Sequence, residues 1–161
     1  MAGASFDSLM GTLDYPMFIV TAADGGTRAG CLVGFATQVS IRPGRFLACI
    51  SEKNRTYRVA RGASHLGVHF VPAHAGELAE LFGGETSDEV DKFALCPWHE
   101  GPQGVPILDD CENWFVGRVA ERNTLGDHVG FILEPEVVHY GTEGRQFTFH
   151  RAKRIEAGHE A

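Results

Sequence analysis

Glycine recurs every few residues along this chain, and that spacing constrains the fold more than any other feature of the sequence. Twenty of the 161 residues are glycine, and short apolar runs rich in β-branched residues lie between them. Glycine weakens helix interiors, whereas tight turns between strands often require it. The pattern therefore predicts one mostly β domain over residues 1–161, with its core between about residues 15 and 150.

Apolar runs between turn signals predict the order of the strands. Residues 15–21, 27–41 and 46–51 should form three strands paired as a meander, with a hairpin turn at residues 23–26. Further strands are predicted at residues 65–71, 111–122, 128–140 and 145–149, the last closing the sheet. Helices are expected at residues 55–61 and 75–82 and in a short segment from a capping box at residues 86–89 to Phe93, and an irregular loop at residues 97–106. Six or seven mostly antiparallel strands with two or three short helices favour a closed barrel or a sandwich.

Composition excludes several classes of function. The formal net charge of −7 argues against general nucleic-acid binding. No stretch approaches the roughly 20 apolar residues that cross a membrane, and the first residues lack the pattern of a secretory signal. The sequence therefore predicts a cytoplasmic protein that binds neither membrane nor nucleic acid.

Cysteine and histidine spacing gives no sign of a metal site. The four cysteines form no CxxC pair and are expected to be inert thiols. His65 and His69 lie four residues apart in a predicted strand, which separates them by roughly 13 Å, too far for one metal ion. We therefore expect no bound metal.

A local reversal of charge marks a candidate anion site. The chain has 14 basic and 21 acidic residues, yet between Arg42 and Arg61 six basic residues accompany the single acid Glu52. Within this segment Asn54 is a predicted helix N-cap. Arg55, with the hydroxyls of Ser51 and Thr56, could form a phosphate cradle at that helix start. The alternative is an ordinary capped helix with a solvated face.

Two glycines in one predicted strand suggest a second contact with a ligand. Gly30 and Gly34 lie four residues apart and should face the same side of the strand. A flat ring system could pack there, and a β-bulge is the alternative. His128 follows a tight turn at Gly126 and Asp127, where the residues alone predict only an exposed histidine.

These segments resemble the flavin reductase family, whose members have an FMN-binding split barrel. The resemblance covers roughly residues 15–149 and rests on five short pieces in order: residues 29–43, 51–56, 91–93, 104–108 and 126–128. It implies an antiparallel Greek-key split barrel that binds FMN, with FAD possible, and takes hydride from NADH or NADPH. It also implies a homodimer and a partner monooxygenase that receives reduced flavin.

The resemblance also assigns roles to individual residues. It implies that His128 lies near the nicotinamide or the face of the flavin, where we expect it to orient the nicotinamide, and that three groups of residues bind the flavin. Many relatives carry Thr and Ser where this chain has Leu32 and Gly34, and Asn where it has His69, which predicts a loosely held, exchangeable FMN. The implied flavin-binding residues are Gly30, Cys31, Leu32, Val33, Gly34 and Phe35 at the ring edge, Cys49, Ile50 and Ser51 beside the ring, and Asn54, Arg55 and Thr56 at the phosphate.

The sequence is also compatible with three other kinds of function. An FMN-binding electron carrier would keep its flavin and never engage NADH. A pyridoxamine-phosphate-type oxidase or a deazaflavin-dependent relative would use the same fold. A bare interaction module would use the segment at Asn54 only as a helix cap.

Overall fold

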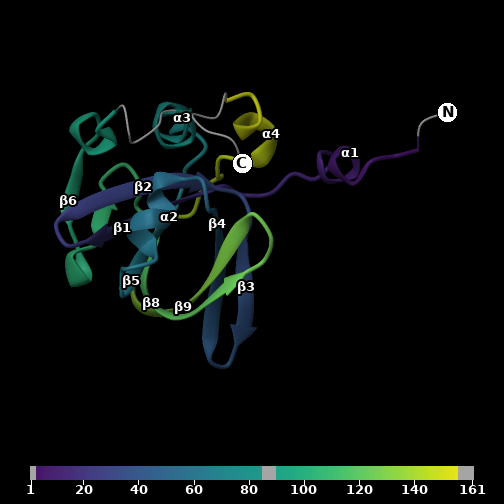
Figure 1. The fold of residues 1–161 in the computed structure, drawn as a ribbon. Coiled ribbons are helices and arrows are strands. Elements are labelled where there is room, and N and C mark those ends of the chain that lie inside the picture. Colours follow the sequence, from purple (N-terminus) through teal and green to yellow (C-terminus); the bar gives the residue numbers. More distant parts are fainter. Residues whose placement is uncertain (1–2, 85–89, 156–161) are drawn as a thin grey trace.

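The computed structural model describes residues 3–84 and 90–155, and strands dominate it. Figure 1 shows the strands as one curved body with α3 and α4 on one side. The predicted mostly β class is confirmed, although four α-helices form where two or three were expected. The strands are β1 (Phe18–Asp24), β2 (Thr27–Val33), β3 (Ala36–Ile41), β4 (Gly44–Ser51), β5 (His65–Phe70), β6 (Trp98–Glu100), β7 (Pro106–Leu108), β8 (Trp114–Thr124) and β9 (His128–His139). The helices are α1 (Phe6–Met10), α2 (Arg55–Ala60), α3 (Gly76–Gly84) and α4 (Phe149–Ala152), with 3-10 turns at Lys92–Ala94 and Pro102–Gly104.

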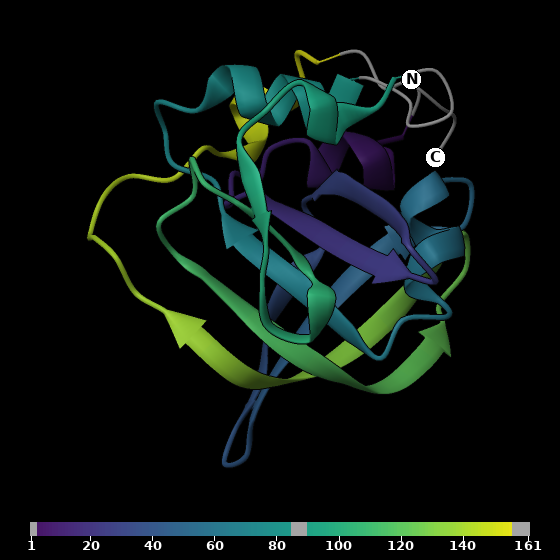
Figure 2. The same cartoon turned by 90° about the vertical axis from the view of Figure 1, so that its left-hand side faces the viewer.

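Seven strands form one antiparallel sheet whose two edge strands follow each other directly in the chain. The order is β2-β1-β5-β8-β9-β4-β3, so β2 and β3 are the edge strands. Only Gly34 and Phe35 connect them in the chain. A connection of two residues cannot cross a flat sheet of seven strands, since strands lie about 4.8 Å apart. The sheet is therefore curled, as Figure 2 shows, and its edges come together at this junction.

The predicted meander is wrong at this junction. The run at residues 27–41 is two strands: β2 pairs with β1 and β3 pairs with β4, and β2 and β3 do not pair with each other. The break occurs at Gly34, where a Cβ atom would lie 3.0 Å from both the Met17 sulfur and the Tyr15 ring. The hairpin of β3 and β4 projects away from the helices in Figure 1.

Two apolar cores lie on opposite faces of β1. Val20 and Ala22 belong to a core inside the curled sheet, together with Phe131 of β9. Ile19 belongs to a second core with Phe82 of α3. Because both faces of β1 are covered, its first five residues are all buried, including the polar Thr21, rather than alternating between buried and exposed.

The predicted turns before β2 and before β9 are confirmed. Gly25 and Gly26 have φ angles of 57° and 85°, which suit the hairpin between β1 and β2. Gly126, with φ 143°, lies in the turn before β9, where the Leu125 N–H donates to the His128 carbonyl over 2.9 Å. The predicted irregularity at Pro135 is present as a register shift opposite Gly117.

Several segments differ from the prediction. The expected irregular loop at residues 97–106 contains β6 and leads into β7, with which β6 pairs. The expected strand at residues 145–149 makes only isolated bridges before α4 begins. The predicted capping box at residues 86–89 lies outside the described residues. Within the described ranges, no helix has the length and apolar character needed to cross a membrane.

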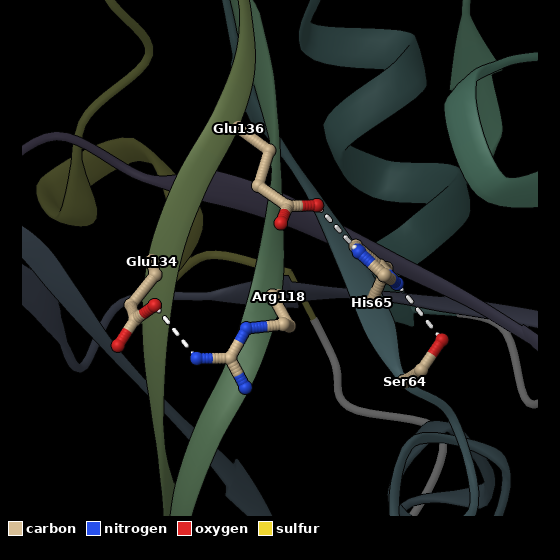
Figure 3. Close-up of polar contacts among 5 residues, drawn as sticks. All are labelled: Ser64, His65, Arg118, Glu134 and Glu136. Carbon is tan, nitrogen blue, oxygen red and sulfur yellow. Dashed lines mark hydrogen bonds and ion pairs between the residues drawn. The ribbon is translucent and has the colours of Figure 1, made fainter.

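A polar ladder links β5, β8 and β9 on an exposed face (Figure 3). His65 Nε2 lies 2.6 Å from a Glu136 carboxylate oxygen, and Ser64 Oγ lies 2.8 Å from the other ring nitrogen. Arg118 donates to Glu134 over 2.7 Å. Exposed pairs of this kind contribute about 1 kcal/mol or less each. The ladder therefore adds modestly to the alignment of the strand that begins at His128.

Candidate functional site

The junction where the sheet edges meet brings together residues from three predicted segments. The Cys49 N–H donates to the Phe35 carbonyl over 2.9 Å. Ser51 pairs in register with His128 across β4 and β9. Phe35, Cys49, Ser51 and His128 are thus neighbours, although they span residues 35 to 128. We call this group the seam site.

The surface of the seam site is formed by the exposed ring of Phe35 and by His128, which is hydrogen-bonded to Asp127. The Phe35 side chain is 58% exposed, and its ring centroid lies 5.1 Å from that of His128. Among the described residues, the ring of His128 hydrogen-bonds only to Asp127, whose Oδ1 lies 2.7 Å from Nδ1. His128 in turn lowers the pKa of the exposed Asp127, through this hydrogen bond and its charge. Asp127 therefore fixes the His128 ring and leaves Nε2 as the nitrogen that can meet a ligand.

A tight turn leads from the seam site into α2. The Asn54 N–H donates to the Ser51 carbonyl over 3.0 Å, and Asn54 Oδ1 accepts from the Thr56 N–H over 2.8 Å. The predicted N-cap at Asn54 and the helix start at Arg55 are confirmed. The same geometry changes the expected phosphate cradle, because the Thr56 N–H is already bound by Asn54.

Thr56 faces the protein interior rather than solvent. Its side chain is fully buried, and its Oγ1 makes no hydrogen bond of ordinary geometry with a described residue. The Cys31 thiol lies close to it, and burial raises the pKa of this thiol to about 11, against weaker opposing effects of Thr56 and Lys92. Of the three residues expected at the phosphate, Arg55 lines a surface hollow, which it shares with Arg58.

The side chains of residues 30–33 are packed inside the protein. Cys31 and Val33 are in the core of the curled sheet, and Leu32 packs against the second core. A Cβ atom at Gly30 would lie 2.8 Å from the Phe82 ring. The flat faces of Gly30 and Gly34 are therefore filled by the protein's own side chains, which corrects the idea that a ring packs on them. Ile50 is buried in the same core as Cys31.

A hollow beside Arg55 brings together residues that the sequence does not group as a site. It has a volume of about 370 Å³ and is lined by Asp24, Thr27, Arg55, Arg58 and Val59. The local excess of basic residues indicates α2, but Asp24 is the last residue of β1 and Thr27 the first of β2. Only the packing of α2 against that hairpin shows them together.

A buried lysine, Lys92, is a second feature that the sequence pattern does not predict. Lys92 is 4% exposed, and its Nζ donates to the carbonyls of Gly30 and Phe82 over 3.3 and 3.2 Å. It ties β2 to α3 directly behind residues 30–33. Its place in the Asp91-Lys92-Phe93 piece was the available signal, but nothing in that piece indicates burial.

A larger hollow lies at the far end of β9 from His128. Its volume is about 540 Å³, and Trp114, His139 and Tyr140 are among its lining residues. None of the expected site residues lines it. In the part of the chain that the structure describes, no three His, Cys, Asp or Glu side chains gather in a way that could hold a metal ion.

The seam site fits a planar, partly apolar cofactor with an anionic tail. An exposed aromatic ring and a half-buried Cys49 offer apolar contact. Arg55 supplies a positive charge at the start of α2, four residues after Ser51 of the seam site. An apolar surface beside a basic side chain is chemically compatible with the flavin ring and phosphate that the resemblance implies.

Comparison with known proteins gives the same assignment. The sequence profile described as "Flavin reductase like domain" matches residues 10–157. The 4-hydroxyphenylacetate 3-monooxygenase reductase component of Pseudomonas aeruginosa is 26% identical over 87% of this chain and 83% of its own length. The FMN reductase (NADH) RutF of Agrobacterium fabrum is 29% identical over 76% of this chain and 70% of its own.

Solved structures share the fold. A flavin reductase domain protein from Arthrobacter superposes with a TM-score of 0.83 at 23% identity, over 91% of this chain and 89% of the other. An NADH:FAD oxidoreductase of Streptomyces globisporus, solved with NAD and FAD fragments, gives a TM-score of 0.80 at 19% identity, over 89% and 86%. The profile match covers most of the chain, so this protein belongs to the family of the flavin reductase like domain.

Proposed function

We propose that this protein is an NAD(P)H-dependent flavin reductase that binds FMN and supplies reduced flavin to a partner monooxygenase. The observation that carries the proposal is the seam site, where Phe35, Ser51 and His128 meet from three separate segments. Membership of the family and relatives named as NADH-dependent FMN reductases support it. The relative named as a monooxygenase reductase component supports the partner.

The residues of the site divide the work between binding and orientation. Phe35 and Cys49 offer apolar contact to a planar ring, and Arg55 attracts its phosphate. His128, fixed by Asp127, orients the nicotinamide through Nε2. When bound, the flavin supplies the hydride-accepting chemistry, so the protein's task is chiefly positioning.

The proposal includes the finer form of the fold. We infer that the curled sheet is a split barrel of Greek-key type and that residues 1–161 act as one domain. Two features support this: the edge strands β2 and β3 are joined by two residues, and the family match runs through residues 10–157.

Nicotinamide absorbance in the presence of excess FMN tests the activity directly. We expect NADH or NADPH to be consumed only when protein and flavin are both present. If both nicotinamides survive while FMN fluorescence is quenched on binding, the chain is an electron carrier. If the protein purifies colourless and leaves FMN fluorescence unchanged, every flavin function is excluded.

Arg55→Ala is expected to weaken FMN binding about tenfold, the effect of losing one charge-assisted contact with phosphate. Riboflavin lacks the phosphate, so its dissociation constant should change little. Fluorescence titration with both flavins measures the difference, and Arg61→Ala, at the exposed C-cap of α2, is the matched control. Equal losses for FMN and riboflavin would place the phosphate elsewhere.

His128→Ala is expected to lower kcat/KM for the nicotinamide about tenfold or more, while the FMN dissociation constant stays within about twofold. The reason is that His128 contributes orientation at the open side of the seam site. Steady-state kinetics at saturating FMN provide the measurement. His139→Ala, at the opposite end of the same strand, serves as control, and a normal rate in His128→Ala removes this residue from the site.

A homodimer completes the proposal. The β3–β4 hairpin leaves Val39 and Ile41 exposed at 47% and 79% and projects from the body. Apolar side chains on a projecting hairpin favour burial against a second copy. Light scattering should give the mass of a dimer, and Ile41→Glu should shift it towards a monomer. A monomeric mass for the unchanged protein contradicts this part of the proposal.

A further inference from the structure

The hollow between α2 and the β1–β2 hairpin lies beyond the flavin phosphate position. Its lining includes two guanidinium groups, a hydroxyl and a carboxylate, from Arg55, Arg58, Thr27 and Asp24. Arg55 belongs both to this hollow and to the start of α2, directly after the seam site. The hollow therefore continues from the phosphate of a flavin held at the seam.

The two arginines are placed to act on one ligand. Residues three apart on a helix lie on the same face, so Arg55 and Arg58 both point towards the β1–β2 hairpin. A guanidinium group donates two parallel hydrogen bonds to the oxygens of one phosphate, and it stays positively charged at all physiological pH values. The Thr27 hydroxyl adds a neutral donor at the opposite wall. This set suits a phosphate in addition to the one that Arg55 contacts in FMN.

Asp24 restricts which groups can lie beside the bound phosphate. Its carboxylate lies against Gly62, where a Cβ atom would overlap it. The absence of a side chain at Gly62 thus allows Asp24 its present position at the hollow. A carboxylate accepts hydrogen bonds from ribose hydroxyls and repels a phosphate on the same ribose. Asp24 therefore favours an unmodified ribose beside the phosphate.

The length of β2 sets the scale of the ligand. Phe35 at the seam lies just beyond one end of this strand, and Thr27 is its first residue. At about 3.3 Å per residue the strand spans roughly 20 Å. That span suits a dinucleotide with one end at the seam and the other at the hollow.

We propose that this hollow binds the second phosphate and the ribose of a dinucleotide, the adenosine diphosphate portion that FAD and the nicotinamide cofactors share. The inference rests on the proposed function, because the seam site must hold a flavin for the hollow to continue it. It assigns Arg58, Thr27 and Asp24 to binding the part of a dinucleotide that FMN lacks, while FMN itself is held by the seam site and Arg55.

Flavin titrations and nicotinamide kinetics on Arg58→Ala test this assignment. Dissociation constants are measured for FMN and FAD by fluorescence, and KM for NADH at saturating FMN. Arg58→Lys keeps the charge without the paired donors, and Arg61→Ala, outside the hollow, is the matched control. Thermal unfolding of each variant shows that the fold is retained, and Thr27→Ala tests the opposite wall without altering charge.

Two results support the proposal and identify the source of the ligand. If Arg58→Ala loses about tenfold in FAD affinity and keeps its FMN affinity, the hollow binds FAD. An increase of similar size in KM for NADH, with both flavin affinities kept, assigns it to the nicotinamide cofactor. Arg58→Lys should then show an intermediate effect in the same measurement, and Thr27→Ala a smaller one.

Two other results overturn it. Equal losses of FMN and FAD affinity would mean that the hollow holds the phosphate of FMN itself. Unchanged FAD affinity together with an unchanged KM for NADH would mean that it holds no nucleotide. Both differ from failure of the proposed function, in which the unmodified protein binds no flavin at all.

Discussion

Replacing Lys92 with methionine is expected to lower the free energy of unfolding by about 3 kcal/mol. Lys92 is buried, and its ammonium group donates to two backbone carbonyls, those of Gly30 and Phe82. Leaving a buried acceptor without its donor costs about 1–3 kcal/mol. Methionine fills a similar volume, so the loss reports the polar contacts rather than a cavity.

Denaturant unfolding followed by fluorescence measures this effect. Lys153→Met is the matched control, since Lys153 is exposed although it also donates to a carbonyl, that of Gly11. Its expected change is within about 0.5 kcal/mol. A similar small change in Lys92→Met would mean that the buried carbonyls find other donors, and that Lys92 does not tie β2 to α3.

The consequence for the site follows from the place of Gly30. Lys92 holds the backbone of β2 four residues before Gly34, where the chain leaves this edge strand for the seam site. A loosened β2 should therefore also weaken FMN binding. Lys92 would then act as a positioning residue, because its side chain lies behind the strand and not on the seam surface.

The sequence predicts correctly those turns and helix starts that depend only on neighbouring residues. Two glycines in succession place the turn at Gly25 and Gly26, and the cap at Asn54 places the start of α2. The turn at Gly126 likewise places the start of β9 correctly. In each case the residues that cause the structure lie within a few positions of it.

The sequence could not reveal what depends on packing between distant segments. Residues 27–41 contain no Pro or Asn to mark the break at Gly34, which arises because Tyr15 and Met17 pack against that glycine. The open face of Gly30 suggested a ligand, but Phe82, 52 positions away, occupies it. Lys92 and Thr56 are also buried by residues that are distant in the sequence. The motifs therefore indicate where the site lies, but they do not predict which of its side chains face the surface.

His69 provides the second large effect, which depends on pH. The ring is fully buried: Nδ1 lies 3.0 Å from the Ile19 carbonyl, and Nε2 accepts from the Leu108 N–H over 3.1 Å. Since Nε2 accepts, the proton of the neutral ring is on Nδ1, which donates to Ile19. Burial lowers the pKa of His69 to about 4, from an ordinary value of 6.5. The folded protein therefore keeps this ring neutral where the unfolded chain protonates it.

This difference in pKa makes the folded state less stable in mild acid. Above pH 6.5 both states hold the ring neutral, and His69 contributes no pH dependence. As the pH falls from 6.5 to 4, only the unfolded chain gains the proton, and the free energy of unfolding decreases by about 1.4 kcal/mol per pH unit. The total loss is about 3 kcal/mol, and below pH 4 this residue causes no further change.

Comparison with His69→Asn isolates the effect, because asparagine can also donate and accept but does not titrate. We expect urea unfolding at a series of pH values to show a shallower decline for this variant between pH 6.5 and 4, whatever its stability at neutral pH. His74→Asn, at an exposed histidine, should follow the unchanged protein. Parallel curves for the unchanged protein and His69→Asn would show that the buried ring takes up its proton in the folded state.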